Sequence, residues 1–128
     1  MDSQLVVYRN VTITGPESRD LSISGNNTNR VFLITTALDV NIFNLNISYG
    51  AAGYEDGGGF CFNAKFNREN HTLNLSNVRI INNSASYGGG ISCVGTDLIL
   101  TNVTISNNSA SEGGGGISCY DTDAILTN

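Results

Sequence analysis

Three kinds of side chain in this sequence are able to do chemistry: cysteine thiols, aspartates and one histidine. Cys93 and Cys119 each end a GGGISC segment, 26 positions apart, and could form a disulfide, a metal site or a pair of buried apolar groups. Parallel side chains at equivalent positions of stacked strands would strain a disulfide, and no histidine shares this column. We therefore expect two stacked, buried thiols that behave as small hydrophobic groups. Cys61 aligns with Ser92 instead and should point the other way.

Aspartates recur at the same spacing. Asp97 and Asp123 are 26 positions apart, and Asp121 lies close by. Stacked carboxylates repel one another unless water solvates them or a cation bridges them. We favour solvated turn residues and keep a weak Ca²⁺ site as the alternative. His71 is the only histidine, and the sequence offers it no nucleophile as a partner, so we expect no catalytic residue, no metal and no cofactor.

Glycine runs interrupt the chain at 57–59, 88–90 and 113–116. A phosphate-binding loop needs a helix after its glycines, and no helical pattern follows any of these runs. The alternating Gly and Asp of calcium-binding nonapeptide repeats are missing as well. The runs therefore predict tight turns that lead into a strand.

The composition narrows the class of protein. Of 128 residues, 18 are Asn, 13% are charged, and the net charge is −5. A negative charge disfavours nucleic-acid binding, and so few charged residues disfavour a helical bundle. Plentiful Val, Ile, Leu and Phe with a single Pro disfavour disorder. There is no apolar stretch of membrane-spanning length and no signal-peptide pattern at the start, so a β-rich chain with many turns is expected.

An internal repeat is the strongest signal in the sequence. LNLSNVRI (73–80) aligns without gaps with LILTNVTI (98–105), and VNIFNLNI (40–47) aligns with both. NNSAS and GGGISC each occur twice, 25 and 26 positions apart. Apolar residues alternate with polar ones over short stretches, and the alternation changes phase at an Asn. Each repeat therefore predicts three short strands separated by corners.

A repeat this short buries its apolar face only by stacking on copies of itself. We predict an all-β fold, a right-handed parallel β-helix (solenoid) of four to five coils of roughly 25 residues, in one domain over 1–128. Residues 1–20 form an N-terminal rung of unsettled register, and 63–72 form a protruding loop insertion. A rung at 21–24, 24 positions before 45–48, is preferred to an alignment of Asn10 with Asn44. Because the chain stops within a strand pattern, we expect a fragment of a longer protein.

Asparagine marks the predicted corners, because its carboxamide can donate to the next one along a stack and its backbone tolerates the left-handed region. The first corner is a structural ladder of Asn44, Asn77, Asn102 and Asn128. The second corner holds Asn82, Asn83, Asn107 and Asn108. Eight Asn-x-Ser/Thr sequons are potential glycan sites in a secreted eukaryotic protein. They are Asn10, Asn26, Asn46, Asn70, Asn74, Asn82, Asn102 and Asn107, and several fall on these corners.

From Leu21 onward the chain resembles proteins of the right-handed parallel β-helix (pectate-lyase-like) superfamily. NNSASYGGGI and NNSASEGGGGI are similar to the Asn-rich and GGAI-type motifs of polymorphic outer membrane protein repeats, with a third Gly where the best-known repeat has Ala. LSISGNNTNRVFLI followed by VNIFNLNISYG resembles the opening coils of bacterial secreted, adhesin-like β-helix proteins. The resemblance implies a pectin lyase-like fold, a place outside the cell or on its surface (the outer membrane in a bacterium), and membership among adhesins and autotransporter passengers.

We expect a non-catalytic scaffold with adhesin-like display of loops. The alternative is part of a polysaccharide lyase or glycoside hydrolase whose catalytic residues lie outside this fragment. Such sites cluster acidic with basic residues on one sheet face, whereas neither outward column here holds a carboxylate. The columns read Thr12, Asn46, Arg79, Thr104 and Asn41, Asn74, Ile99, Ile125. Arg79 also interrupts the flat Thr array of an ice-binding solenoid. Expected partners are a carbohydrate or a host or cell-surface protein, without nucleic acid, and with membrane association only through other parts of the protein.

Overall fold

The structure is a computed structural model that describes residues 3–18, 20–36, 38–64 and 71–128. These residues form sixteen strands and no helix, which confirms the all-β prediction. Sheet A contains β1 (Leu5–Val7), β4 (Phe32–Ile34), β7 (Phe60–Asn63), β11 (Ile91–Val94) and β15 (Ile117–Tyr120). Sheet B contains β2 (Val11–Thr14), β5 (Val40–Phe43), β8 (Thr72–Ser76), β12 (Asp97–Thr101) and β16 (Ala124–Thr127). Sheet C contains β3 (Ser22–Ser24), β6 (Asn46–Ser48), β9 (Arg79–Ile81) and β13 (Thr104–Ser106), and sheet D contains β10 (Ser84–Tyr87) and β14 (Ser109–Gly113).

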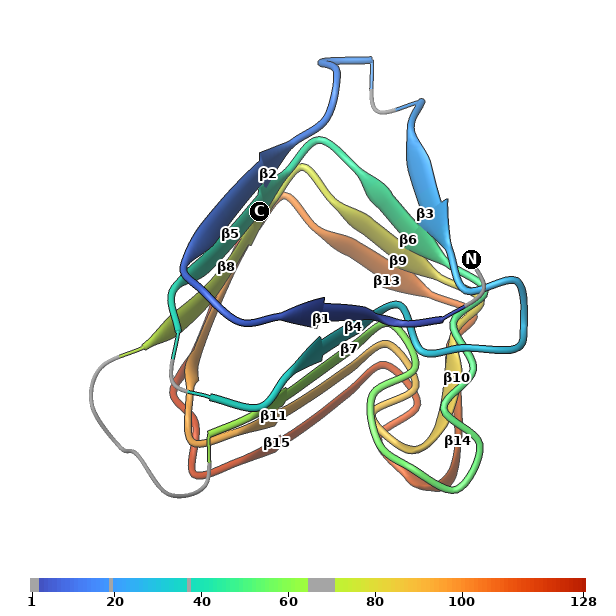
Figure 1. Cartoon of the computed structure of the whole chain (residues 1–128). Helices are drawn as coiled ribbons and strands as arrows, with labels where there is room; N and C mark the ends of the chain where they lie inside the picture. The colour runs from blue at the N-terminus through green and yellow to red at the C-terminus, as the bar shows by residue number, and fades with distance from the viewer. Residues whose placement is uncertain (1–2, 19, 37, 65–70) are drawn as a thin grey trace.

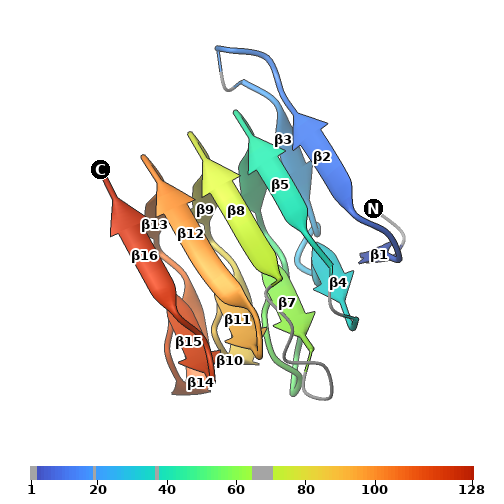
Figure 2. The same cartoon turned by 90° about the vertical axis from the view of Figure 1, so that its left-hand side faces the viewer.

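Each coil passes through sheet A, then sheet B, then sheet C, and returns to sheet A by a longer path (Figure 1). All strand pairs are parallel, and Figure 2 shows the strands of sheet B side by side, one from each coil. The chain turns clockwise as it recedes from the viewer in Figure 1. The fold is therefore a right-handed parallel β-solenoid of about four turns.

The strand register follows the repeat read from the sequence. Leu98 pairs with Leu73, which in turn pairs with Val40. Ile23 pairs with Ile47, which confirms the rung at 21–24. One placement was wrong: Thr12 pairs with Asn41 and not with the column of Asn46, because β2 joins sheet B and precedes the corner instead of following it.

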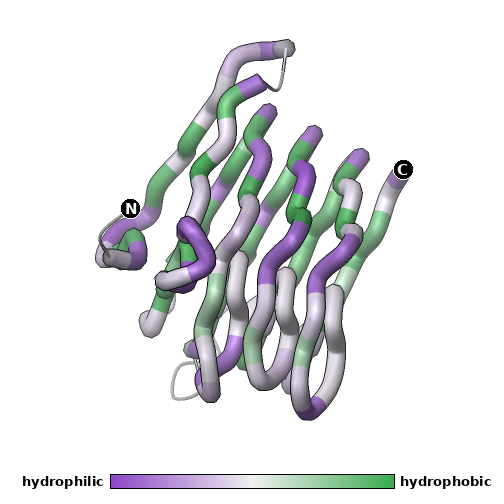
Figure 3. Tube along the Cα trace, turned by 90° about the vertical axis from the view of Figure 1, so that its right-hand side faces the viewer, coloured by the Kyte–Doolittle hydropathy of each residue, from purple (hydrophilic) through white to green (hydrophobic). Residues whose placement is uncertain are grey.

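The core is a set of continuous apolar ladders inside the solenoid. Val40, Leu73 and Leu98 are fully buried in one ladder, and the aromatic rings of Phe32 and Phe60 stack with centroids 5.0 Å apart in sheet A. Such a stacked pair contributes about 0.5–1.5 kcal/mol beyond the burial of its area. Figure 3 shows hydrophobic and hydrophilic positions alternating along the coils, as expected for strands with one buried face.

Sheet D is a fourth element where three strands per coil were expected. The NNSAS segments read as a corner, yet Ala85 pairs with Ala110 along the stack, and Ala51 bridges to Ser84 one coil earlier. Here the chain leaves the triangular outline and forms a lobe, defined by residues 51–59, 84–90 and 109–116, at the lower right of Figure 1. Glycine is required in its turns, since Gly88 has φ 60° and a Cβ at Gly89 would lie 2.2 Å from the Ser109 carbonyl oxygen.

The two ends of the stack are hollowed and apolar. The hollow at the C-terminal end measures about 530 Å³ and is lined by Leu100, Ile105 and Leu126 among others. The hollow at the N-terminal end measures about 520 Å³ and includes Val7 and Ile13. Side chains that are buried in the central coils therefore become accessible in the first and last coils.

Candidate functional site

The first predicted corner lies between sheets B and C, and Asn occupies it in three successive coils. Asn44, Asn77 and Asn102 have φ of 58°, 54° and 51°, the left-handed region that Asn tolerates better than other side chains. The Nδ2 of Asn77 donates to Oδ1 of Asn44 at 3.3 Å, and Asn102 donates to Asn77 in the same way. Asn128 directly follows the Thr101–Thr127 pair and continues the column by register. This corner uses Asn for both its backbone conformation and its carboxamide.

The second corner divides these two tasks between adjacent residues. Asn82 and Asn107 supply the left-handed backbone, with φ of 57° and 54°. The neighbouring Asn83 and Asn108 supply the side-chain ladder, in which Asn83 Nδ2 donates to Asn108 Oδ1 at 3.0 Å. Asn83 is 1% exposed, and its Oδ1 accepts the N–H of Gly50 at 2.8 Å. The five carboxamides that stack at these two corners are thus occupied in holding coils together.

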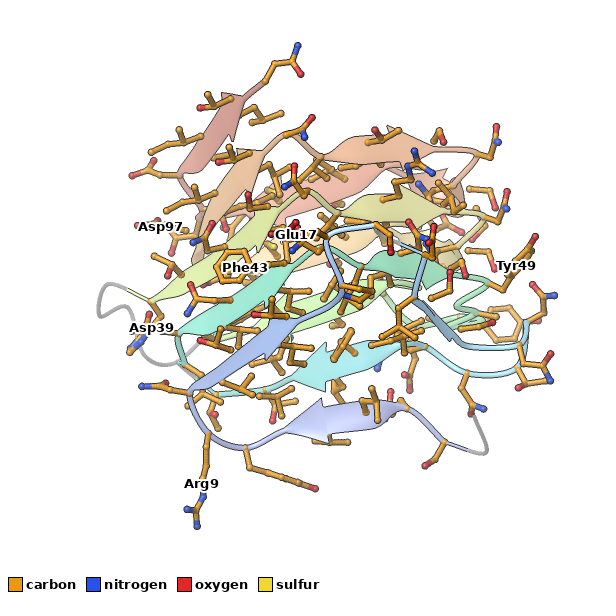
Figure 4. The ribbon with its side chains drawn as sticks, turned by 90° about the horizontal axis from the view of Figure 1, so that it is seen from above. Arg9, Glu17, Asp39, Phe43, Tyr49 and Asp97 are labelled. Atoms are coloured by element: carbon orange, nitrogen blue, oxygen red, sulfur yellow. The ribbon has the colours of Figure 1, made fainter. Side chains whose placement is uncertain are left out.

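A third polar column lies at the start of the strands of sheet B, either directly before the strand or at its first residue. Asp39 N–H donates to Asn10 Oδ1 at 2.9 Å, and Thr72 N–H donates to Asp39 Oδ1 at 3.0 Å. Between the last two coils, Asp123 N–H donates to Asp97 Oδ1 at 3.4 Å; Figure 4 shows Asp39 and Asp97 at the same edge. Of this column, only Asp97 and Asp123 were predicted to stack from the sequence. Within the described ranges, no cluster of three or more His, Cys, Asp or Glu side chains is placed to hold a metal ion.

The cysteines occupy the columns expected of them, but their burial differs. Cys93 pairs in register with Cys119, and Cys93 is fully buried. Cys119 is exposed, which corrects the expectation of two buried thiols, because β15 lies in the last coil and its inner face borders the open end. The Cys93 thiol donates to the Cys119 sulfur. This hydrogen bond and burial raise the pKa of Cys93, and the hydrogen bond lowers the pKa of Cys119 although burial partly opposes it. Cys61 pairs with Ser92 on the outer face.

Only the flanks of the predicted loop at 63–72 are described. Its centre, 65–70, which includes the sequon Asn70, lies outside the described residues, as do residues 1–2 and 19 of the N-terminal rung. His71, next to this centre, uses its carbonyl oxygen as a structural acceptor for Asp97 N–H at 2.8 Å and for the Thr96 hydroxyl at 2.9 Å.

A buried arginine was missed by the sequence analysis. Arg30 is 6% exposed, and its guanidinium contacts two neighbouring parts of the chain. It donates to the carbonyl oxygens of Asp56 and Gly57 at 2.9 and 3.0 Å, to Gln4 Oε1 at 3.0 Å and to Glu55 Oε2 at 2.9 Å. Arg30 therefore fastens the lobe to the N-terminal coil. Its only signal in the sequence is that it is a charged residue directly before an apolar run, Val31 to Ile34.

A groove on the outside of the molecule is the most site-like feature of the described surface. It measures about 270 Å³ and lies between the lobe and the outer face of sheet A. Asp56 and Tyr87 line it from the lobe, and Ser92, Cys93, Val94, Ser118 and Tyr120 line it from sheet A. Tyr87 and Tyr120 are 44% and 74% exposed. Two accessible aromatic rings, a carboxylate and hydroxyls equip this groove to bind a small polar ligand.

Comparisons with models of protein families, with curated proteins and with solved structures give no match. The chain is defined by its architecture, as a parallel β-solenoid of about four turns built from an internal repeat. The described residues contain no helix, and therefore no helix that could span a membrane.

Proposed function

We propose that this chain is a non-catalytic segment of a surface-exposed or secreted β-helix protein, which acts as a rigid scaffold and displays loops for adhesion. One observation carries the proposal. The polar side chains at three corners of the coil are taken up by hydrogen bonds between coils, whereas the lobe and the 63–72 insertion vary in length from coil to coil. A stiff body with variable outward loops suits display.

The resemblance of NNSASYGGGI and NNSASEGGGGI to polymorphic outer membrane protein repeats supports this proposal. The resemblance favours an adhesin-like β-helix protein that works outside the cell or on its surface. The partner class that follows is a carbohydrate or a protein of another cell's surface. Fold alone does not set function, so the proposal needs a binding experiment.

The test compares the wild-type chain with a variant in which Gly-Gly replaces residues 65–70. The shorter corner of the next coil, where Gly95 and Thr96 join β11 to β12, shows that the stack accepts a short connection. Beads coated with either protein are incubated with cultured cells and with films of extracellular polysaccharide. After washing, the beads that remain bound to each surface are counted. We expect the wild-type beads to adhere and the variant to lose most adhesion while keeping its β-sheet circular dichroism.

Wild-type beads that adhere to none of these surfaces would overturn display for adhesion. Incubation with pectin or alginate is the accompanying control for enzymatic activity. Release of unsaturated or reducing sugars by the purified chain would replace the scaffold proposal with a polysaccharide lyase or glycoside hydrolase.

A further inference from the structure

The groove between the lobe and sheet A is lined by polar groups that make no hydrogen bond to the described part of the protein. Among the described residues, no hydrogen bond engages the Asp56 carboxylate or the hydroxyls of Tyr87 and Tyr120. This contrasts with the Asn44, Asn77, Asn83 and Asp39 side chains at the corners, which bond to a neighbouring coil. Groups that line a hollow and serve no internal contact are available to a ligand.

Two aromatic rings stand at the rim of the groove, and one of them packs against the next coil. Tyr87 pairs with Gly113 in sheet D, and a Cβ on Gly113 would lie 3.6 Å from the Cδ1 and Cε1 atoms of the Tyr87 ring. The Tyr87 ring thus rests over a residue without a side chain. Tyr120 stands on the outer face of β15, in register with Val94. Both rings offer a flat apolar surface at the rim of a polar floor.

Charge decides which polar ligand suits the groove. Among the residues that the structure describes, its lining includes the Asp56 carboxylate and no Lys or Arg. The nearest placed cation, Arg30, is already bonded to Glu55, Gln4 and two carbonyl oxygens, and the net charge of the chain is −5. An anionic ligand would therefore be repelled and would find no counter-ion. A neutral ligand with several hydroxyls and one apolar face could hydrogen-bond to the carboxylate and hydroxyls of the groove and pack on its aromatic rings.

We propose that this groove binds one neutral pyranose unit of a saccharide. The C–H face of the sugar packs on the ring of Tyr120 or Tyr87, two adjacent hydroxyls donate to the Asp56 carboxylate, and Ser92 and Ser118 provide the polar floor. The volume of about 270 Å³ is slightly below the roughly 300–1,000 Å³ of drug-sized sites, which suits a single sugar ring. The inference deepens the proposed display function and rests on it for its setting outside the cell.

The test is a titration of the ¹⁵N-labelled chain with methyl β-glucoside, methyl β-galactoside and N-acetylglucosamine, followed by amide chemical shifts. We expect at least one sugar to shift the amides of residues 56, 87, 92–94 and 118–120, with weak, roughly millimolar affinity because the groove is small and open. Tyr120→Ala and Asp56→Asn should each weaken binding more than tenfold. Tyr54→Ala is the matched control, since Tyr54 lies in the lobe, is fully exposed and does not line the groove.

Several outcomes would overturn the inference. They are the absence of any sugar-dependent shift at the groove, equal affinity of Tyr120→Ala and wild type, or a response to tetramethylammonium with none to any sugar. Galacturonate should bind more weakly than its neutral counterpart, and the reverse order would also contradict the charge argument. If the groove fails these tests while the coated beads still adhere to cells, the display function stands and the saccharide site does not.

Discussion

Arg30 donates a hydrogen bond from its Nε–H to the backbone carbonyl oxygen of Asp56 at 2.9 Å, across 26 positions of the sequence. The same guanidinium reaches Gln4 and Glu55. Through this residue the loop that carries one wall of the groove is bound to the coil beneath it. The position of Asp56, and with it the geometry of the groove, depends on a side chain that is itself almost wholly buried.

Replacing Arg30 should therefore destabilise the lobe. Arg30→Met leaves the carbonyl oxygens of Asp56 and Gly57 without their charged donor, at an expected cost of about 2–3 kcal/mol in the free energy of unfolding. Glu55→Gln is the matched control, because the Glu55 side chain of this ion pair is 75% exposed and such pairs contribute about 1 kcal/mol or less. Urea denaturation followed by circular dichroism measures both. An equal loss in the two variants would mean that the ion pair, not the carbonyl contacts, holds the lobe.

The first Asn corner allows its two tasks to be separated. Asn77→Gly keeps the left-handed backbone available and removes the carboxamide, for an expected loss of about 1 kcal/mol. Asn77→Leu also forces a side chain into the left-handed region, which adds about 1–2 kcal/mol. The comparison is made by thermal and urea unfolding of both variants. If the Leu variant is as stable as the Gly variant, the left-handed φ of 54° at this position does not restrict which side chain it accepts.

The second corner predicts opposite behaviour for two neighbouring residues. Asn82→Gly should change stability by only a few tenths of a kcal/mol, since glycine readily adopts its φ of 57°. Asn83→Ala should cost about 2–3 kcal/mol, because it leaves the Gly50 N–H and the Ile47 carbonyl oxygen buried without their partner. The measurement is the free energy of unfolding of each single variant. Similar values for the two would contradict the assignment of the backbone conformation to Asn82 and of the hydrogen bonds to Asn83.

Alkaline pH should weaken the fold through Cys61. Burial raises the pKa of this thiol in the folded protein, and the charge of Arg30 offsets the rise only in part. A thiol with a raised folded pKa binds its proton more tightly in the native state, so its contribution is complete below the ordinary thiol pKa of about 8.5 and is lost as the pH rises above it.

Cys61→Ser isolates this effect, because Ser occupies the same column at Ser92 in the next coil. We expect the free energy of unfolding to fall less between neutral and alkaline pH in the variant than in the wild type. The measurement is a urea titration under reducing conditions at several pH values. Parallel pH profiles would show that another group is responsible.

The sequence predicted those features that recur once per coil. Asn44, Asn77 and Asn102 lie one coil apart at equivalent positions, so alignment alone places them in a column, and the apolar ladders follow from the same argument. Thr12 was misplaced because the first coil lacks the corner Asn, where Gly15 stands instead, and the resemblance of NVTI segments then pointed to the wrong sheet.

Features that occur once in the molecule were not predictable from the repeat. Arg30 donates to backbone carbonyl oxygens of a loop. Because every residue has such an acceptor, the spacing of residue types in the sequence does not reveal this contact. The groove brings Asp56 of one coil next to Tyr87 of the next and Tyr120 of the one after, and this meeting depends on how far the lobe curls back over sheet A. The exposure of Cys119 depends on its place in the last coil, which its column does not reveal.

Each strand of this solenoid touches only the coil before it and the coil after it, and the coils at either end have one neighbour instead of two. Stability in such a linear array is a sum of the terms within coils and between adjacent coils. Fraying from either end therefore costs less than opening in the middle. Amide hydrogens of β5 and β8 should exchange with solvent most slowly, and those of β1 and β16 fastest, so that protection against exchange forms a gradient along the stack.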